Sequence, residues 1–203
     1  MLTLTSESTV EPVTVTEFRT FLRMESTDST AEDTLLANYI TVARLLAENI
    51  TKRQLVQASR SLVIDNFANT TAVIELPRPP LSTVSTNISI TYVKDTTVGD
   101  TTTVGSTVFT IDPDSEPGRI YPSYGNEWPD DIRGQRNAVR INYVCGYTSV
   151  NICPEPIKNW IKMRAAAMYE YREPIIANED IENLSYEFVD GILDQYRIVT
   201  IYD

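Results

Sequence analysis

The stretch from Pro154 to Glu173, PEPIKNWIKMRAAAMYEYRE, is the clearest helix in this sequence. Its apolar residues recur at steps of three and four, which places them along one stripe of an α-helix. The two prolines at its start suit a first helical turn, and Pro174 cannot continue the helix. Lys158 and Lys162 fall off the stripe, so we expect both to face water. The residues expected on the buried stripe are Ile157, Trp160, Ile161, Ala165 and Met168.

The same stretch carries aromatic and arginine side chains beside its apolar stripe. Such side chains can bury their stems and keep a polar tip at an edge, and Tyr, Trp and Arg are enriched at the centres of protein interfaces. Two interpretations stay open, a core helix with amphipathic rims and a partner contact. The candidate residues for contacts between the helices or with a neighbouring subunit are Trp160, Arg164, Tyr169 and Arg172.

Two further helices are predicted near the N-terminus. The sequence Thr14-Val-Thr-Glu17 fits a capping box, and the apolar residues that follow it predict a helix of at most three turns. A second candidate box, Ser29-Thr-Ala-Glu32, predicts the start of a longer amphipathic helix that reaches about residue 52. Each helix has one apolar face that must be covered, so both are expected to pack with the helix at 154–173.

After Arg53 the apolar period changes from helical to alternating, which predicts an antiparallel β insert of five or six strands. The expected fold class is therefore α+β, a small domain of about three helices interrupted by this insert, with an extended C-terminal tail. We assign 1–53 and 151–174 to the helical core, 54–150 to the insert and 175–203 to the tail. The strands are expected around Leu62/Ile64, Ile74/Leu76, Val84 to Tyr92, Phe109/Ile111 and Val139 to Cys145.

Composition excludes several function classes. The 203 residues carry a formal charge of -11, which disfavours a general attraction to nucleic acid phosphates. The sequence has no histidine, so histidine metal sites and Ser-His or Cys-His nucleophile pairs are ruled out. No apolar run approaches the length that spans a bilayer, and the N-terminus lacks the features of a signal peptide. We expect a protein of the compartment in which it is made, without membrane contact.

The remaining polar residues do not form a recognisable catalytic site. Cys145 and Cys153 are expected to be buried thiols, because nothing else in the chain suggests export. The adjacent acids Asp130/Asp131 and Glu179/Asp180 lie in predicted loops and do not face one another, so we expect them to be solvated. No glycine-rich phosphate loop or EF-hand loop is present. The residues alone thus indicate a non-enzymatic interaction module with no cofactor and no metal.

The C-terminal tail combines an acidic stretch with an apolar end. Residues 173–203 contain eight acids and Arg197, which gives this part a charge of -7. The residues after Gly191 are nevertheless apolar and β-prone, whereas chain ends are usually polar and frayed. The end is expected either to form a last strand of the β insert or to add itself to another chain's sheet edge.

The order of these features resembles the head-to-tail connector proteins, also called adaptor or head completion proteins, of long-tailed bacteriophages and related gene transfer agents. The similar pieces extend over nearly the whole chain, and their order and spacing make the resemblance more specific than any single piece. They include Glu11-Pro-Val-Thr, Leu76-Pro through Pro80-Leu, Trp128-Pro129, Val139-Arg-Ile-Asn-Tyr, Tyr169-Glu-Tyr-Arg-Glu173 and Ile192-Leu-Asp-Gln-Tyr-Arg197. The Thr-rich segment from Asp95 to Thr107 departs from the family pattern.

This resemblance implies a structural virion protein that forms a ring, dodecameric in the family, below the portal and extends the DNA channel toward the tail. DNA would pass without specific binding, and assembly would take place in the host cytoplasm. Deleting the chain after Gly191 is then expected to abolish portal binding and leave the fold intact. The residues expected to dock on the portal are Leu193, Tyr196, Ile198, Val199 and Ile201.

Two alternatives remain open beside this interpretation. The first is another neck or tail-completion protein that contacts the tail side. The second is a carboxylate-dependent hydrolase, which would need three or more carboxylates gathered around a metal ion.

Overall fold

The computed structural model describes residues 1–24, 30–83, 87–95, 101–149, 152–171 and 191–198. The chain forms two compact units, which we call the β unit (Met1–Ser8 and Gln57–Gly146) and the helical unit (Thr9–Val56 and Tyr147–Asp203). All named strands lie in the β unit, and the named helices lie in the helical unit. The α+β class predicted from the sequence is confirmed.

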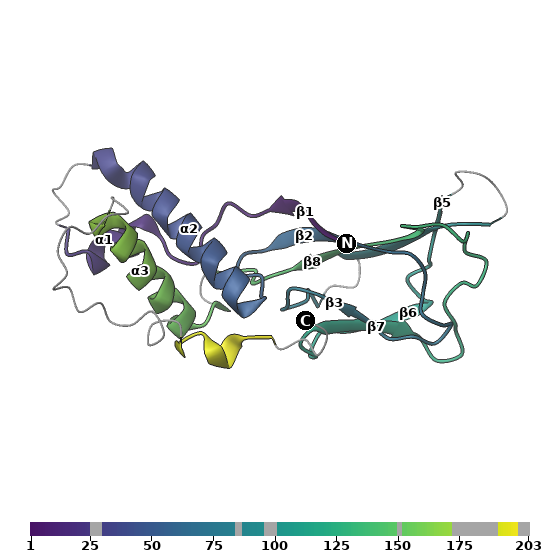
Figure 1. Cartoon of the computed structure of the whole chain (residues 1–203). Coiled ribbons are helices and arrows are strands. Elements are labelled where there is room, and N and C mark those ends of the chain that lie inside the picture. The colour runs from purple at the N-terminus through teal and green to yellow at the C-terminus, as the bar shows by residue number, and fades with distance from the viewer. Residues whose placement is uncertain (25–29, 84–86, 96–100, 150–151, 172–190, 199–203) are drawn as a thin grey trace. The chain divides into compact units, whose positions relative to one another are not determined.

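The β unit contains two antiparallel sheets (Figure 1). The larger sheet has the strand order β1-β2-β8-β4-β5, and the smaller has the order β3-β7-β6. The strands of the larger sheet are β1 (Leu2–Glu7), β2 (Ala58–Ile64), β8 (Val139–Cys145), β4 (Ile88–Val93) and β5 (Thr101–Thr103). Those of the smaller sheet are β3 (Ile74–Leu76), β7 (Gly118–Pro122) and β6 (Phe109–Asp112).

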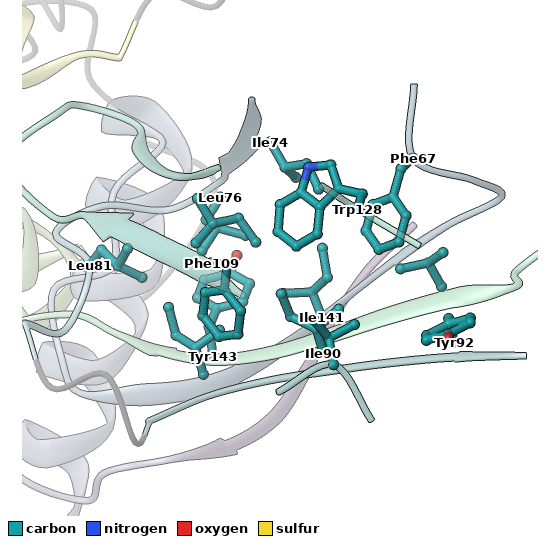
Figure 2. Packing of buried hydrophobic residues seen from close by; sticks show 14 of the residues in the cluster. Phe67, Ile74, Leu76, Leu81, Ile90, Tyr92, Phe109, Trp128, Ile141 and Tyr143 are labelled. Carbon is teal, nitrogen blue, oxygen red and sulfur yellow. The ribbon is translucent and has the colours of Figure 1, made fainter. Parts of the chain in front are cut away.

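The core of the β unit is built from the alternating residues of these strands. In β8, Val139, Ile141 and Tyr143 are buried while Arg140 and Asn142 are exposed, as expected for a strand with one face in a core. Figure 2 shows Trp128 beside Phe67, with the isoleucines of the larger sheet directed toward them. The rings of Trp128 and Phe67 stack at a centroid distance of 4.7 Å.

Polar atoms in this core are paired. The indole N–H of Trp128 donates to the carbonyl of Ala72 at 2.7 Å, and the hydroxyl of Tyr143 donates to the carbonyl of Pro77 at 2.7 Å. Burial raises the pKa of the Tyr143 hydroxyl. A buried Trp or Tyr normally finds such a partner, because an unpaired donor would be costly in this environment.

Three strands were not predicted from the sequence. Residues 2–7, which we assigned to the helical part, form β1 and pair with β2. Thr101–Thr103, inside the Thr-rich segment, forms β5, and Gly118–Pro122 forms β7. Each of these strands has few apolar residues, so its place in a sheet depends on a partner strand distant in the sequence.

The helical unit consists of α1 (Val15–Phe21), α2 (Asp33–Thr51) and α3 (Glu155–Glu170), with short 3-10 helices at Thr30–Glu32 and Asp194–Tyr196. Helices α2 and α3 pack side by side (Figure 1). Four of the five residues predicted on the α3 stripe are buried, and Met168 is half-buried. The capping box of Thr14 and Glu17 is present with both hydrogen bonds, and the N–H of Thr14 holds the pKa of Glu17 below its ordinary value.

One local prediction about the helices is wrong, and another is not tested. Helix α2 follows a 3-10 turn, and its N-cap Glu32 makes no side-chain capping bond, while Ser29 of the expected second capping box lies outside the described residues. Lys158 was expected to face water but is only 5% exposed. Its stem lies in the packed surface, and its ammonium group pairs with Glu155 at 2.8 Å, where the Glu155 side chain is 70% exposed. A long lysine can therefore bury its methylenes and reach solvent at the tip.

Candidate interaction surfaces

A buried polar network stabilises the C-terminal half of α2. The guanidinium of Arg44 pairs with Glu11 at 2.8 Å and with Glu48 at 3.1 Å. The carboxylate of Glu48 also accepts from the side-chain amide of Gln54 at 3.0 Å and from the backbone N–H of Leu55 at 2.9 Å. Arg44 and Glu48 are 2% and 3% exposed. These hydrogen bonds and ion pairs join residues of one unit and hold the chain after α2 against the helix, so they stabilise the fold.

This network was not predicted from the sequence, although a signal was present. Arg44 and Glu48 are four residues apart and lie among apolar α2 residues that face the core. A charged pair at this spacing inside an apolar stripe indicates a buried ion pair, because isolated charges are rarely buried.

Two of the four candidate contact residues, Trp160 and Tyr169, make contacts within the helical unit. Trp160 is 1% exposed and belongs to the core of the unit. The hydroxyl of Tyr169 donates to Glu32 at 2.6 Å, and its ring meets that of Tyr39 edge to face at 6.5 Å. Both therefore make contacts inside the helical unit, and a contact of either with a neighbouring subunit stays a prediction. Arg164 is half-buried, and Arg172 lies outside the described residues.

The described part of the C-terminal tail, residues 191–198, folds against the helical unit. Ile198 donates its backbone N–H to the carbonyl of Thr51 at 3.0 Å, and the Arg197 side chain donates to the carbonyl of Ile50 at 3.3 Å. In return, the Arg53 side chain donates to the carbonyl of Tyr196 at 2.6 Å. The last carbonyls of a helix have no intrahelical partner, so this segment caps the C-terminal end of α2.

Because of these contacts, some of the candidate docking residues pack within their own subunit. Leu193 is fully buried in the core of the helical unit, with Tyr196 packed beside it. Residues 194–196 form a 3-10 helix, so the described part of the tail is neither a last strand of the β insert nor free. Tyr196 and Ile198 are half-buried, while Val199 and Ile201 lie outside the described residues. Leu193 therefore packs in the core of its own subunit.

The acidic pair Asp130/Asp131 does not form a catalytic arrangement. Asp130 is exposed, and Asp131 pairs with the ammonium group of Lys94 at 3.2 Å. Burial, and then a hydrogen bond to Asp131, raise the pKa of Tyr92 to about 12. The other pair, Glu179/Asp180, lies outside the described residues. Asp131 thus forms an ion pair with Lys94 and a hydrogen bond with Tyr92.

Both cysteines are free and buried, as the sequence predicted. Burial raises the pKa of Cys153 to about 12, which keeps it as an unreactive thiol at neutral pH. Across the described ranges, no three His, Cys, Asp or Glu side chains come together in a way that could hold a metal ion. In the same residues, no helix combines the length and apolar character needed to cross a membrane.

Three solved structures that are similar to this chain come from gene transfer agent particles. The chain superimposes on a protein from the "Neck of empty GTA particle computed with C6 symmetry" with a TM-score of 0.75 and 25% identity, covering 99% of this chain and 97% of that one. A chain from the "Virion of native gene transfer agent (GTA) particle" gives a TM-score of 0.73 at 23% identity over the same shares. A third, from the "Neck of native GTA particle computed with C12 symmetry", gives 0.72 at 23% identity, again over 99% and 97%.

Comparison with protein-family models and with curated proteins finds no match. The likeness to the three particle proteins therefore rests on their structures. It extends over both units of this chain, because almost the whole length is covered in each case.

Proposed function

We propose that this protein is a structural component of the neck of a tailed phage or gene transfer agent particle, where copies of it form a ring below the portal. The observation that carries the proposal is the likeness over 99% of the chain to a protein from the neck of such a particle. Neck structures computed with sixfold and twelvefold symmetry agree with a ring of identical subunits. The ring would extend the DNA channel, and its negative charge would favour passage of DNA over binding.

The test is quantitative mass spectrometry of purified particles from the host of this protein. We expect the copy number of the chain to equal that of the portal protein, because a ring stacked on the portal matches it subunit for subunit. A chain that is absent from the particles would contradict the proposal. Cross-linking on the same particles then distinguishes the portal side from the tail side, where a tail-completion protein would make its contacts.

Within this function, we assign portal docking to the end of the tail beyond the core contact of Leu193. The candidate residues are Tyr196, Ile198, Val199 and Ile201. The truncation after Gly191 that the sequence suggested is a poor test, because it would also remove Leu193 from the core and uncap α2. Deleting only residues 199–203 leaves every described contact of the tail in place.

We therefore expect the chain that ends at Ile198 to fold normally and to lose binding to purified portal protein. Circular dichroism checks the fold, and sedimentation with the portal measures binding. A control chain with Leu193→Ala keeps residues 199–203 but loses core packing, so it should be less stable while the docking end remains. Full portal binding by the chain that ends at Ile198 would show that Val199 and Ile201 are not needed for docking.

A further inference from the structure

Within the part of the chain that the structure describes, the larger sheet of the β unit has two open edges, formed by β1 and β5 at opposite ends of the strand order. On β1, the amino group of Met1 donates to the carbonyl of Val63, and Val63 donates back to Met1, both at 2.8 Å. Antiparallel pairs alternate between bonded and non-bonded positions. Leu2 and Leu4 therefore direct their backbone N–H and C=O groups away from β2, toward the open edge.

The same reasoning applies to β5. Val104 donates its N–H to the carbonyl of Ile90 at 2.9 Å, which marks a bonded position of the β4–β5 pair. Counting back along the strand, Thr101 and Thr103 are at non-bonded positions, opposite Val93 and Thr91. Their backbone N–H and C=O groups point away from β4. Each edge thus offers two residues, spaced by two, with backbone groups free to pair.

Neither edge carries the residues that normally prevent such pairing. Exposed edges of natural sheets are usually guarded by lysine, proline or inward-pointing charges. The segments Leu2–Leu4 and Thr101–Thr103 contain none of these, and Leu4 is 49% exposed. A β-bulge between Leu4 and Ser6 ends the regular part of β1, which leaves three residues on each edge. Copies of a chain with charge -11 repel one another, so an uncharged surface favours contact between them.

The arrangement also suits a ring. A head-to-tail contact joins two different surfaces of neighbouring copies and closes when the rotation between them is that of a ring. The larger sheet has five strands with all neighbours antiparallel, so β1 and β5 run in the same direction. The similar neck structures have sixfold and twelvefold symmetry. Rotating one copy by a sixth or a twelfth of a turn does not reverse its strands, so β5 of one copy can meet β1 of the next copy in parallel.

We infer that β1 of one copy pairs in parallel with β5 of the next copy, so that the larger sheets are joined around the ring. This inference rests on the proposed ring. In a parallel pair, one residue bonds to two residues of the other strand that flank it. Leu4 donates its N–H to the carbonyl of Thr101 in the next copy, and its carbonyl accepts from the N–H of Thr103 there. Leu4 then lies level with Thr102 of the next copy.

The side chains fit this register. Leu4 lies opposite Arg60, which lies opposite Tyr143, and these directly paired residues share one face of the sheet. Thr102 lies opposite Tyr92, which lies opposite Val139, on the same face as Tyr143. Residues that are level in a parallel pair point to the same side. The proposed pairing brings the exposed Leu4 side chain against Thr102 and covers part of it.

The experiment uses particles assembled with the double variant L4C/T102C. Within one copy these positions are four strand spacings apart, about 19 Å, too far for the Cα separation of about 4–7 Å that a disulfide needs. The native Cys145 and Cys153 are buried and should not interfere. After mild oxidation with copper phenanthroline, a non-reducing gel should show a ladder of covalent multimers. Particles with the L4C/T103C pair are the matched control, because the Thr103 side chain lies on the other face.

A ladder from L4C/T102C and none from L4C/T103C is the expected result. Particles that contain L4C/T102C at the copy number of the portal protein but give no ladder would overturn the pairing and leave the ring standing. Dimers from L4C alone would also overturn it, because they would show β1 paired with β1. Particles built from a mixture of L4C and T102C chains give a second measurement, in which only covalent dimers that join the two kinds of chain are expected.

Discussion

At the scale of single residues, the carboxylate of Glu48 lies at the centre of the buried polar network of the helical unit. It accepts from Arg44, Gln54 and Leu55 and is 3% exposed. Breaking one side of a buried ion pair leaves the other charge without compensation, which costs more than the pair itself contributes. The network therefore makes the junction after α2 intolerant of small chemical changes.

We expect Glu48→Gln to lower the free energy of unfolding by about 3 kcal/mol, because a neutral amide no longer compensates the buried charge of Arg44. Urea denaturation measures the change. The matched control is Glu75→Gln, since Glu75 pairs with Arg119 at 3.7 Å on the surface, with both side chains about half exposed. That change should cost less than about 1 kcal/mol. Equal losses in the two variants would contradict a special role for the buried network.

At the scale of elements, the two sheets of the β unit approach each other where β7 meets the segment after β3. Leu81, which bridges to Cys145 of the larger sheet, lies against Gly118 at the start of β7. A Cβ atom built on Gly118 would lie 2.7 Å from the Cβ of Leu81. The contact is with the base of the Leu81 side chain, which is fixed to the backbone, so rotation of the side chain cannot relieve it.

Gly118→Ala is accordingly expected to destabilise the protein by about 1–3 kcal/mol, the usual cost of forcing extra volume into a packed core. Gly134→Ala is the control, because a Cβ atom there meets nothing within 4 Å. Thermal unfolding followed by circular dichroism compares the two variants with the native chain. A melting temperature for Gly118→Ala that matches the control would show that the sheets can separate at this point without cost.

At the scale of the whole molecule, the chain crosses between two units that each have their own hydrophobic core. The sequence has two tryptophans, and one lies in each core, Trp128 in the β unit and Trp160 in the helical unit. Variants that keep a single tryptophan can thus report the unfolding of each unit by fluorescence. A change confined to one core is expected to weaken mainly the unit that contains it.

In a Trp128→Phe background, where Trp160 reports, Glu48→Gln should shift the urea midpoint more than Gly118→Ala does. In a Trp160→Phe background, where Trp128 reports, the order should reverse. Each comparison is made within one background, so the cost of removing a tryptophan cancels. If every variant shifts both reporters equally, the two cores unfold as one cooperative unit.

The sequence by itself determined the parts that depend on neighbouring residues. The α3 stripe of Ile157, Trp160, Ile161 and Ala165, the capping box at Thr14 and the alternation of β8 all follow from local periodicity, and they proved correct. The two buried thiols also followed from the sequence. For the candidate contact residues, the sequence showed that the side chains are amphipathic. It could not show which residue each of them contacts.

Only the tertiary structure decided the features that join distant parts of the chain. It placed residues 2–7 beside β2, buried Lys158 and Leu193, and closed the network of Arg44 and Glu48 with Glu11 and Gln54. The physical reason is that strand pairing and burial depend on what a segment packs against, and a partner many residues away leaves no trace in local periodicity. The open edges of the larger sheet were equally invisible until the strand order was known.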